Sequence, residues 1–146
     1  MAKAPTAGYS GTPLLKKLGY TSEQSAALVD VPKPLRPHLT AAKFKQLAEI
    51  AIDATGGLKP PLDAIHLFTT ERAKLKRALP QLMKRLAPAG MIWVSWPKKA
   101  AKVETDITED VIRAEALPLG LVDVKVCAVD ETWSGLKLVI RKELRK

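Results

Sequence analysis

Short apolar runs alternate with amphipathic stretches along most of the 146-residue chain. Residues 25–32, 62–70 and 91–96 are mostly apolar, which is typical of strands buried on both faces of a sheet. Residues 121–129 and 136–142 alternate apolar and polar positions, and the short loop between them predicts an antiparallel pair. One face of the first of these two strands is expected to carry Val122, Val124, Val126 and Ala128.

Helical periodicity is clearest in residues 71–88. Apolar residues three and four positions apart form one stripe there, namely Leu75, Ala78, Leu79, Leu82 and Leu86. Pro80 lies inside this stretch and is expected to kink the helix or to split it in two. A second helix is predicted to follow a cap at Asp106 or Thr108 and to run to about Leu117.

The secondary structure of residues 39–54 and of the amino-terminal segment follows from weaker patterns. Residues 39–54 begin with a helical pattern, but residues 49–53 alternate, so the pattern leaves open a separate strand or the end of the helix. Thr12, Pro13 and Gly19 predict the cap, first position and end of a short helix. Residues 1–8 are expected to be a flexible tail, which leaves residues 9–146 as a single domain.

The predicted order is strand, helix, strand, helix, strand, helix and then a strand pair. Strands that alternate with helices predict a parallel sheet with right-handed crossovers and helices on both faces. We therefore expect an α/β fold: a Rossmann-like three-layer α/β/α sandwich whose mostly parallel sheet ends in a carboxyl-terminal antiparallel hairpin.

Composition adds the charge and the expected compartment. The formal net charge is +9, which favours phosphate-rich partners and also keeps a protein in solution. The single cysteine, Cys127, excludes an internal disulfide framework and fits a reducing compartment. No secretory signal and no membrane-spanning apolar stretch is found in the sequence, so a cytoplasmic protein is expected.

Residues 86–99 and the closing strand pair resemble the carboxyl half of class I methyltransferases, which use S-adenosylmethionine. In that family a Pro-Gly-Gly turn precedes the fifth strand, and here the turn reads Pro88-Ala89-Gly90. The segments GYSGTPLLKKLG, WVSWPKK, TEDVIR and GLVDVKVCAVDETWSGLKLVIRK are similar to a bacterial family, domain-of-unknown-function family 3052. This similarity covers most of the chain outside residues 32–61, and it implies a Rossmann-like sheet without an established activity.

The resemblance departs from the methyltransferases at the cofactor loop. Their glycine-rich turn after the first strand lets the backbone approach the cofactor. The corresponding segment here is VDVPKPLRPH, which has three prolines and no glycine. We therefore expect a shortened methyltransferase-like sheet and no cofactor. The family's acidic residue after the second strand corresponds to Asp53 only if residues 49–53 form that strand.

Ligands of open α/β sheets bind outside the carboxyl ends of the strands. A methyltransferase-like hairpin would bring Trp133 near Trp96 at that edge, with two lysines beside the indoles and the start of a helix near Ile107 to favour an anion. The residues expected to form this site for a small anionic ligand are Thr69, Thr70, Trp96, Lys98, Lys99, Asp130, Thr132 and Trp133. In the alternative interpretation, Trp96 only covers the end of the sheet, the lysines are solvated and Trp133 packs a turn.

No catalytic or metal site is expected. His66 lies inside a strand, where a structural role is more common than metal binding, and His38 has no partner ligand in the pattern. Cys127 also lies within a strand, and Ser95 lacks a Gly-x-Ser-x-Gly elbow. Adjacent carboxylates at Asp130 and Glu131 are better explained by a turn than by acid/base catalysis.

The hypotheses for function follow from these patterns. The leading one is a non-enzymatic protein that binds a small anionic ligand or a partner at the strand ends. The first alternative is a nucleic-acid-associated protein, with the carboxyl-terminal residues 141–146 and a helix face of Lys74, Arg77, Lys84 and Arg85 contacting phosphates. The second alternative is a divergent S-adenosylmethionine-dependent methyltransferase. No membrane partner is expected.

Overall fold

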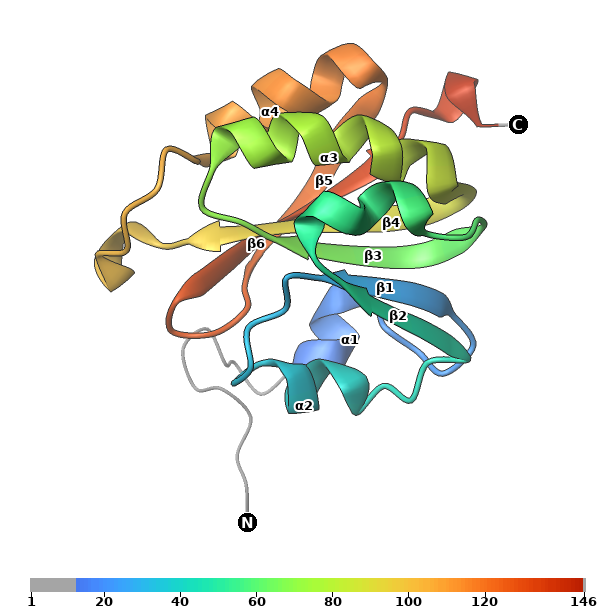
Figure 1. The fold of residues 1–146 in the computed structure, drawn as a ribbon, viewed down its shortest axis with the longest axis horizontal. Coiled ribbons are helices and arrows are strands. Elements are labelled where there is room, and N and C mark those ends of the chain that lie inside the picture. The colour runs from blue at the N-terminus through green and yellow to red at the C-terminus, as the bar shows by residue number, and fades with distance from the viewer. Residues whose placement is uncertain (1–12, 146) are drawn as a thin grey trace.

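A six-stranded sheet forms the centre of the computed structural model, which describes residues 13–145 (Figure 1). The strands are β1 (Ser25–Val29), β2 (Gln46–Ile50), β3 (Leu62–Phe68), β4 (Leu86–Pro97), β5 (Leu121–Ala128) and β6 (Trp133–Ile140). They lie in the order β2-β1-β3-β4-β6-β5. The first four strands in this order are parallel, and β6 runs antiparallel to both of its neighbours. The predicted mostly parallel sheet with a closing antiparallel hairpin is confirmed.

Helices cover both faces of this sheet (Figure 1). One face carries α3 (Arg72–Arg85), α4 (Glu109–Ala116) and the 3₁₀-helix η1 (Ile52–Gly57), and the other carries α1 (Leu14–Leu18) and α2 (Arg36–Thr40). Three more 3₁₀ turns are η2 (Lys99–Ala101), η3 (Leu117–Leu119) and η4 (Lys142–Leu144). The three-layer prediction is therefore confirmed. No helix within residues 13–145 is long and apolar enough to cross a membrane.

Two apolar clusters hold the layers together, one on each face. Side chains alternate between the faces along a strand, so neighbouring residues of β3 and β4 enter different clusters. The cluster under α3 and α4 includes Ile65, Leu67, Ile92 and Val94. The cluster under α1 and α2 includes Ala64, Phe68, Met91 and Trp93. Burial on both faces explains why these strands read as nearly continuous apolar runs.

The long helix α3 agrees with its apolar stripe, because Leu75, Ala78, Leu79 and Leu82 are buried. The predicted split at Pro80 is wrong, since α3 continues through this residue as one helix of 14 residues. A proline inside a helix costs about 3 kcal/mol. Burial of the stripe at about 1.5–3 kcal/mol for each large side chain outweighs that cost.

The region that follows β1 differs from its prediction. The expected helix from residue 39 is wrong, because α2 ends at Thr40 and β2 already begins at Gln46. β2 pairs in parallel with β1, and its last residue, Ile50, lies opposite Val29. Glu49 therefore belongs to a strand, whereas Asp53 lies in η1. Pairing with β1 overrides the weak helical pattern of this short segment.

The hairpin departs from its predicted alternation at one point. The register between β5 and β6 shifts between Asp123 and Lys125, which leaves Val124 as the extra residue of a bulge. Val122 lies opposite Val139, whereas Val126 lies opposite the buried Leu136. The prediction that the four apolar residues of β5 share one face is therefore wrong, because a bulge reverses the alternation beyond it.

The short amino-terminal helix ends at Gly19, as predicted. Gly19 ends α1 with a φ of 79°, a left-handed conformation that glycine adopts without strain. The predicted cap at Thr12 and the predicted tail at residues 1–8 lie outside the described residues.

Candidate functional site

The strand order reverses at β1, which has β2 on one side and β3 on the other. In open α/β sheets, ligands bind beside such a reversal at the carboxyl ends of the strands. Here that edge is formed by the turn after β1, the start of η1, the turn between β3 and α3, and the loop after β4 (Figure 1).

The two tryptophans at this edge do not form an aromatic pair. Trp133 lies opposite Pro97 in the β4–β6 ladder, and Trp96 lies opposite Ser134. Trp96 therefore packs in the cluster under α3 and α4, whereas Trp133 lies on the other face, with its ring 5.3 Å from that of Phe68. The predicted pairing of the indoles is wrong, because adjacent ladder positions point to opposite faces.

The loop after β4 and the hairpin turn have structural roles. The N–H of Lys98 donates to the carbonyl of Thr132 at 2.7 Å, and this bond joins the two segments. Asp130 Oδ1 accepts the N–H groups of Thr132 and Trp133 at 2.8 and 2.7 Å. Such a carboxylate shapes a turn. Lys99 is exposed in η2. A ligand role for these residues stays a prediction.

The two threonines after β3 stabilise the same edge. Thr69 is buried, and its hydroxyl accepts the N–H of Glu71 at 3.2 Å. The carbonyl of Thr70 accepts the hydroxyl of Thr105 at 2.7 Å, which holds the loop before α4 against the end of β3. Asp106 contributes to the same closure, because its carboxylate accepts the first N–H of α3, from Arg72, at 2.7 Å.

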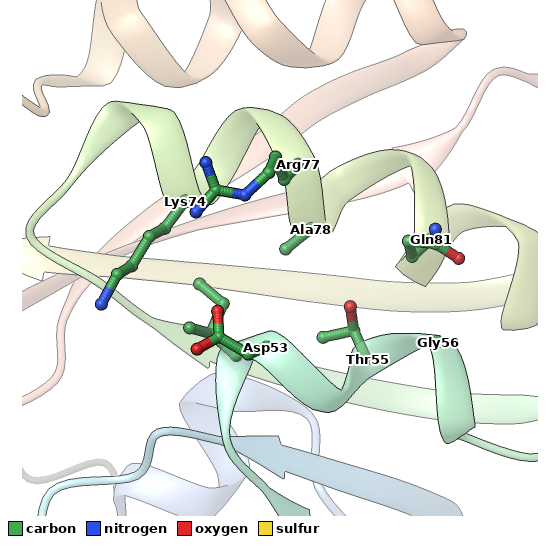
Figure 2. Close-up of a pocket in the computed structure, with 8 residues that line it drawn as sticks. Asp53, Thr55, Gly56, Lys74, Arg77, Ala78 and Gln81 are labelled. Atoms are coloured by element: carbon green, nitrogen blue, oxygen red, sulfur yellow. The ribbon is translucent and has the colours of Figure 1, made fainter.

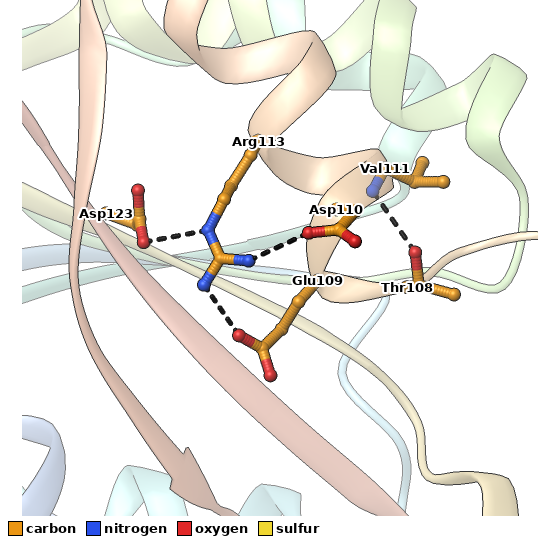
Figure 3. Close-up of polar contacts among 6 residues, drawn as sticks. All are labelled: Thr108, Glu109, Asp110, Val111, Arg113 and Asp123. Atoms are coloured by element: carbon orange, nitrogen blue, oxygen red, sulfur yellow. Dashed lines mark hydrogen bonds and ion pairs between the residues drawn. The ribbon is translucent and has the colours of Figure 1, made fainter.

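The start of α4 is capped and carries negative charge (Figure 3). Thr108 caps it by accepting the N–H of Val111 at 3.2 Å, as one of the two sequence alternatives predicted. Glu109 and Asp110 occupy the first turn, and both carboxylates bind Arg113. An anion near this helix start is therefore disfavoured, because two carboxylates already lie there.

Arg113 joins α4 to the sheet (Figure 3). Its Nε donates to Asp123 of β5 at 3.0 Å, and its terminal nitrogens bind Glu109 and Asp110 at 2.6 and 3.1 Å. The hydrogen bonds from Asp123 and Glu109 raise the pKa of the guanidinium. Three carboxylates on one arginine fix its side chain in place, which makes this cluster an anchor for α4.

Side chains also gather around a cavity of about 260 Å³ between η1 and α3, on one face of the sheet (Figure 2). Ile52, Asp53, Thr55 and Gly56 line it from η1, and Lys74, Arg77, Ala78 and Gln81 line it from α3. In Figure 2 the carboxylate of Asp53 and the two cations lie toward one end, and Gln81 and Gly56 lie toward the other.

Two of the charges in this cavity are uncompensated. Lys74 pairs with Glu71 at 3.4 Å on the surface. Within residues 13–145, neither Asp53 nor Arg77 makes an ion pair or a side-chain hydrogen bond. The cavity therefore offers a guanidinium, which binds carboxylates and phosphates, and a carboxylate, which accepts hydroxyl or amine donors.

Several residues of this cavity stand out in the sequence, but their proximity in the fold cannot be predicted from it. Lys74 and Arg77 were predicted on one helix face, as part of a nucleic-acid-binding surface. The sequence suggests a role for Asp53 only as the acidic residue after a second strand. Their proximity depends on η1 packing against α3, and no sequence signal marks a six-residue 3₁₀-helix as the partner of a distant helix.

Arg85 is not available for a ligand. Its Nε donates to the carbonyl of Leu58 at 3.0 Å, and its terminal nitrogens donate to the carbonyls of Gly56 and Gln81 at 2.5 and 2.9 Å. These bonds hold the end of η1 against α3. The predicted phosphate contact through Arg85 is therefore corrected to a structural role.

The turn after β1 would have to cradle S-adenosylmethionine if this cofactor were bound as in class I methyltransferases. Asp30 has a φ of 53°, and its carboxylate accepts the N–H of Ile52 at 3.1 Å, which joins the turn to η1. Arg36 binds Glu49 through two hydrogen bonds of 2.6 Å, which joins α2 to β2. The bond from Arg36 lowers the pKa of the Glu49 carboxyl.

The residues of this turn do not fit the cofactor. Pro32 and Pro34 have no N–H to donate, and the N–H of Leu35 is used by the carbonyl of Pro32 at 3.0 Å. No glycine lies between Asp30 and Arg36 to allow a close approach of the backbone. In place of a glycine-rich loop, the chain therefore has a turn that contains prolines and is stabilised by its own backbone hydrogen bonds.

Two of the residues considered for metal binding or catalysis, His66 and Ser95, are buried in the interior. His66 is fully buried and hydrogen-bonds to the hydroxyl of Tyr20 at 2.9 Å and to that of Ser95 at 2.7 Å. Burial lowers the pKa of His66 to about 3 and raises that of Tyr20. Cys127 is half-buried in β5, and burial raises the pKa of its thiol. Both His66 nitrogens thus have protein partners.

Comparisons with known proteins agree with the fold. No family model matches the chain, and no curated protein matches it. Among solved structures, an S-adenosylmethionine-dependent methyltransferase from Aquifex aeolicus is 16% identical with a TM-score of 0.57, and the match covers 87% of each chain.

Two further structures match in the same way. Ribosomal protein L11 methylase from Lactobacillus delbrueckii is 12% identical with a TM-score of 0.53, over 82% of this chain and 70% of that one. Magnesium protoporphyrin IX methyltransferase from Synechocystis is 10% identical with a TM-score of 0.56, over 88% and 78%. At these identities the likeness shows the fold alone. The chain thus has a methyltransferase-like Rossmann fold, and the similarity to family 3052 stays a prediction.

Proposed function

We propose that this protein binds a small anionic ligand in the cavity between η1 and α3. The observation that supports the proposal is the presence of an uncompensated guanidinium, Arg77, and an uncompensated carboxylate, Asp53, in the lining of one cavity. A single anionic group would satisfy Arg77 and Lys74 but would leave Asp53 unmatched. A ligand that carries a phosphate or carboxylate together with hydroxyl groups matches both charges.

The size of the cavity limits the ligand. A volume of about 260 Å³ lies just below the 300–1,000 Å³ that is usual for drug-sized ligands, so a compact molecule such as a sugar phosphate fits better than an adenosyl cofactor. A binding role, without catalysis, is favoured by the enclosure of Ser95 and His66 in the interior, away from this cavity.

The test uses thermal unfolding with ribose 5-phosphate as the probe and inorganic phosphate for comparison. A ligand present at about ten times its Kd adds about 1.4 kcal/mol to the free energy of unfolding. For a chain of this size that corresponds to a rise in Tm of about 3–6 °C. We expect the rise to disappear in the Lys74→Gln/Arg77→Gln variant, and the preference for the sugar phosphate to disappear in Asp53→Asn.

The matched control removes two cations from the other predicted site. Lys98→Ala/Lys99→Ala carries the same change in net charge, and it should keep the full rise in Tm. If this control loses the rise while Lys74→Gln/Arg77→Gln keeps it, the ligand binds at the loop after β4 and the cavity is not the site.

A second candidate function is an S-adenosylmethionine-dependent methyltransferase, which the shared fold favours. The proline-containing turn after β1 opposes it, so we expect no rise in Tm with S-adenosylmethionine or S-adenosylhomocysteine. A rise with either compound would support the methyltransferase and would show that the cofactor binds without a glycine cradle.

A further inference from the structure

The exposed side of α3 carries a concentration of positive charge that extends beyond the cavity. Residues 72–85 contain six cations and no carboxylate. Three of these cations have partners: Arg72 pairs with Glu115, Lys74 pairs with Glu71, and Arg85 binds carbonyl groups. The other three cations are available for contacts with a partner molecule.

The remaining cations are Lys76, Arg77 and Lys84, and all three are exposed. None of them makes an ion pair within residues 13–145. Arg77 and Lys84 are two helical turns apart and lie on the same side of α3, and Lys76 flanks them. Lys76 and Lys84 are separated by about 12 Å along the helix axis, at 1.5 Å per residue.

Charge is also unevenly distributed over this face of the molecule. The neighbouring segment of residues 104–116, which ends in α4, has five carboxylates and one cation. A long anion would be repelled from the α4 side and attracted to the α3 side, since α3 and α4 lie next to each other on the same face of the sheet (Figure 1).

We propose that α3 is a docking surface for the phosphate backbone of double-stranded nucleic acid. Duplex DNA carries about one negative charge per 1.7 Å of its axis, so a row of cations about 12 Å long faces several phosphates at once. No aromatic residue lies on η1 or α3, so these elements offer no stacking platform for single-stranded bases. The contact is to phosphates and does not depend on the base sequence.

This surface shares Arg77 with the ligand cavity, but its other two cations, Lys76 and Lys84, do not line the cavity. It also revises the sequence-based set for nucleic-acid binding. Arg77 and Lys84 are retained, and Lys76 is added. Lys74 is removed because it pairs with Glu71, and Arg85 is removed because carbonyl groups already bind it.

The test measures the binding of the whole chain to a fluorescein-labelled DNA duplex of about 20 base pairs by anisotropy, between about 50 and 200 mM NaCl. Three phosphate contacts predict a slope of about −2.7 in log K against log salt, and hence a loss of about 40-fold in affinity over this range. Lys76→Gln/Lys84→Gln leaves one contact, so the loss should fall to about 3.5-fold.

Lys98→Gln/Lys99→Gln is the matched control, because it removes two cations from a different surface and should keep the steep slope. An equal effect of the two double variants would overturn the proposal in favour of net charge alone. Tighter binding of the single strand than of the duplex would also overturn it. Lys76→Gln/Lys84→Gln should keep the rise in Tm with ribose 5-phosphate, so the failure of either proposal can be recognised separately.

Discussion

Stability should depend on pH because His66 is buried in its neutral form. Burial lowers the pKa of His66 in the folded protein to about 3, whereas a histidine in an unfolded chain titrates near 6.5. The unfolded state therefore binds a proton between these values and the folded state does not. Stability is complete above about pH 6.5 and is lost as the pH falls toward 3, because the proton favours unfolding.

The size of the effect follows from these two pKa values. At pH 5 the unfolded form of this one histidine is favoured by about 2 kcal/mol relative to pH 7.5, and the slope below pH 6 approaches about 1.4 kcal/mol per unit. That is a large fraction of the 5–15 kcal/mol by which domains of this kind are stable. Aspartates and glutamates in an unfolded chain titrate mainly below about pH 5, so the interval from 7.5 to 5 reports mainly on histidine.

Urea unfolding followed by tryptophan fluorescence gives the free energy of unfolding at each pH. Wild type should lose about 2 kcal/mol between pH 7.5 and 5. His66→Gln should be less stable at pH 7.5, because one amide cannot replace both bonds to Tyr20 and Ser95, but its stability should change little with pH. His38→Gln removes the chain's other histidine and should keep the wild-type slope. A wild-type curve that is flat over this interval would refute the reasoning, and so would a slope that persists in His66→Gln.

Other substitutions test the helices. Thr108→Ala removes the oxygen that accepts the N–H of Val111, and it should lower the free energy of unfolding by about 1 kcal/mol in urea titrations. Pro80→Ala restores the missing N–H inside α3 and should raise the free energy of unfolding by about 2 kcal/mol. This value is a gain of about 3 kcal/mol in the helix less about 1 kcal/mol for the greater freedom of the unfolded chain. An unchanged or lower free energy of unfolding would mean that the helix relies on the proline ring for packing. Leu79→Ala leaves a cavity under α3 and should lower the Tm by an amount equivalent to 2–5 kcal/mol.

The sheet could be predicted because its information is local. Each central strand is an apolar run, and the alternation of strands with helices restricts the topology to parallel crossovers. The failures lie where a long-range partner decides the outcome. The segment before β2 has a helical pattern of its own, and only pairing with β1 makes residues 46–50 a strand. The bulge at Val124 is another such case, because its register belongs to the pair of strands and not to β5 alone.

The predicted aromatic pair failed for a related reason. The sequence could bring β6 beside β4, but the face that each indole occupies depends on the parity of their register. Trp133 lies opposite Pro97, so Trp96 and Trp133 point to opposite faces; a shift by one residue would have placed them together. Proximity of two strands is therefore much easier to predict from sequence than proximity of two side chains. The cavity between η1 and α3 cannot be predicted in this way, because it depends on two elements that pack against each other on one face of the sheet.

The way in which the molecule could hold an anion follows from its turn after β1. Rossmann-like proteins commonly bind phosphates through backbone N–H groups at this turn. Here two positions of the turn are proline, and the N–H of Asp30 donates to the carbonyl of Ile50 at 2.9 Å. Lys74 and Arg77 of α3 line the cavity beside η1, so the anion of the proposed site is held by side chains. A site made of backbone N–H groups tolerates most substitutions. A site made of Lys74 and Arg77 is abolished when these two side chains are replaced, while the fold remains. Function in this fold would then depend on a few exposed side chains that the sheet itself does not require.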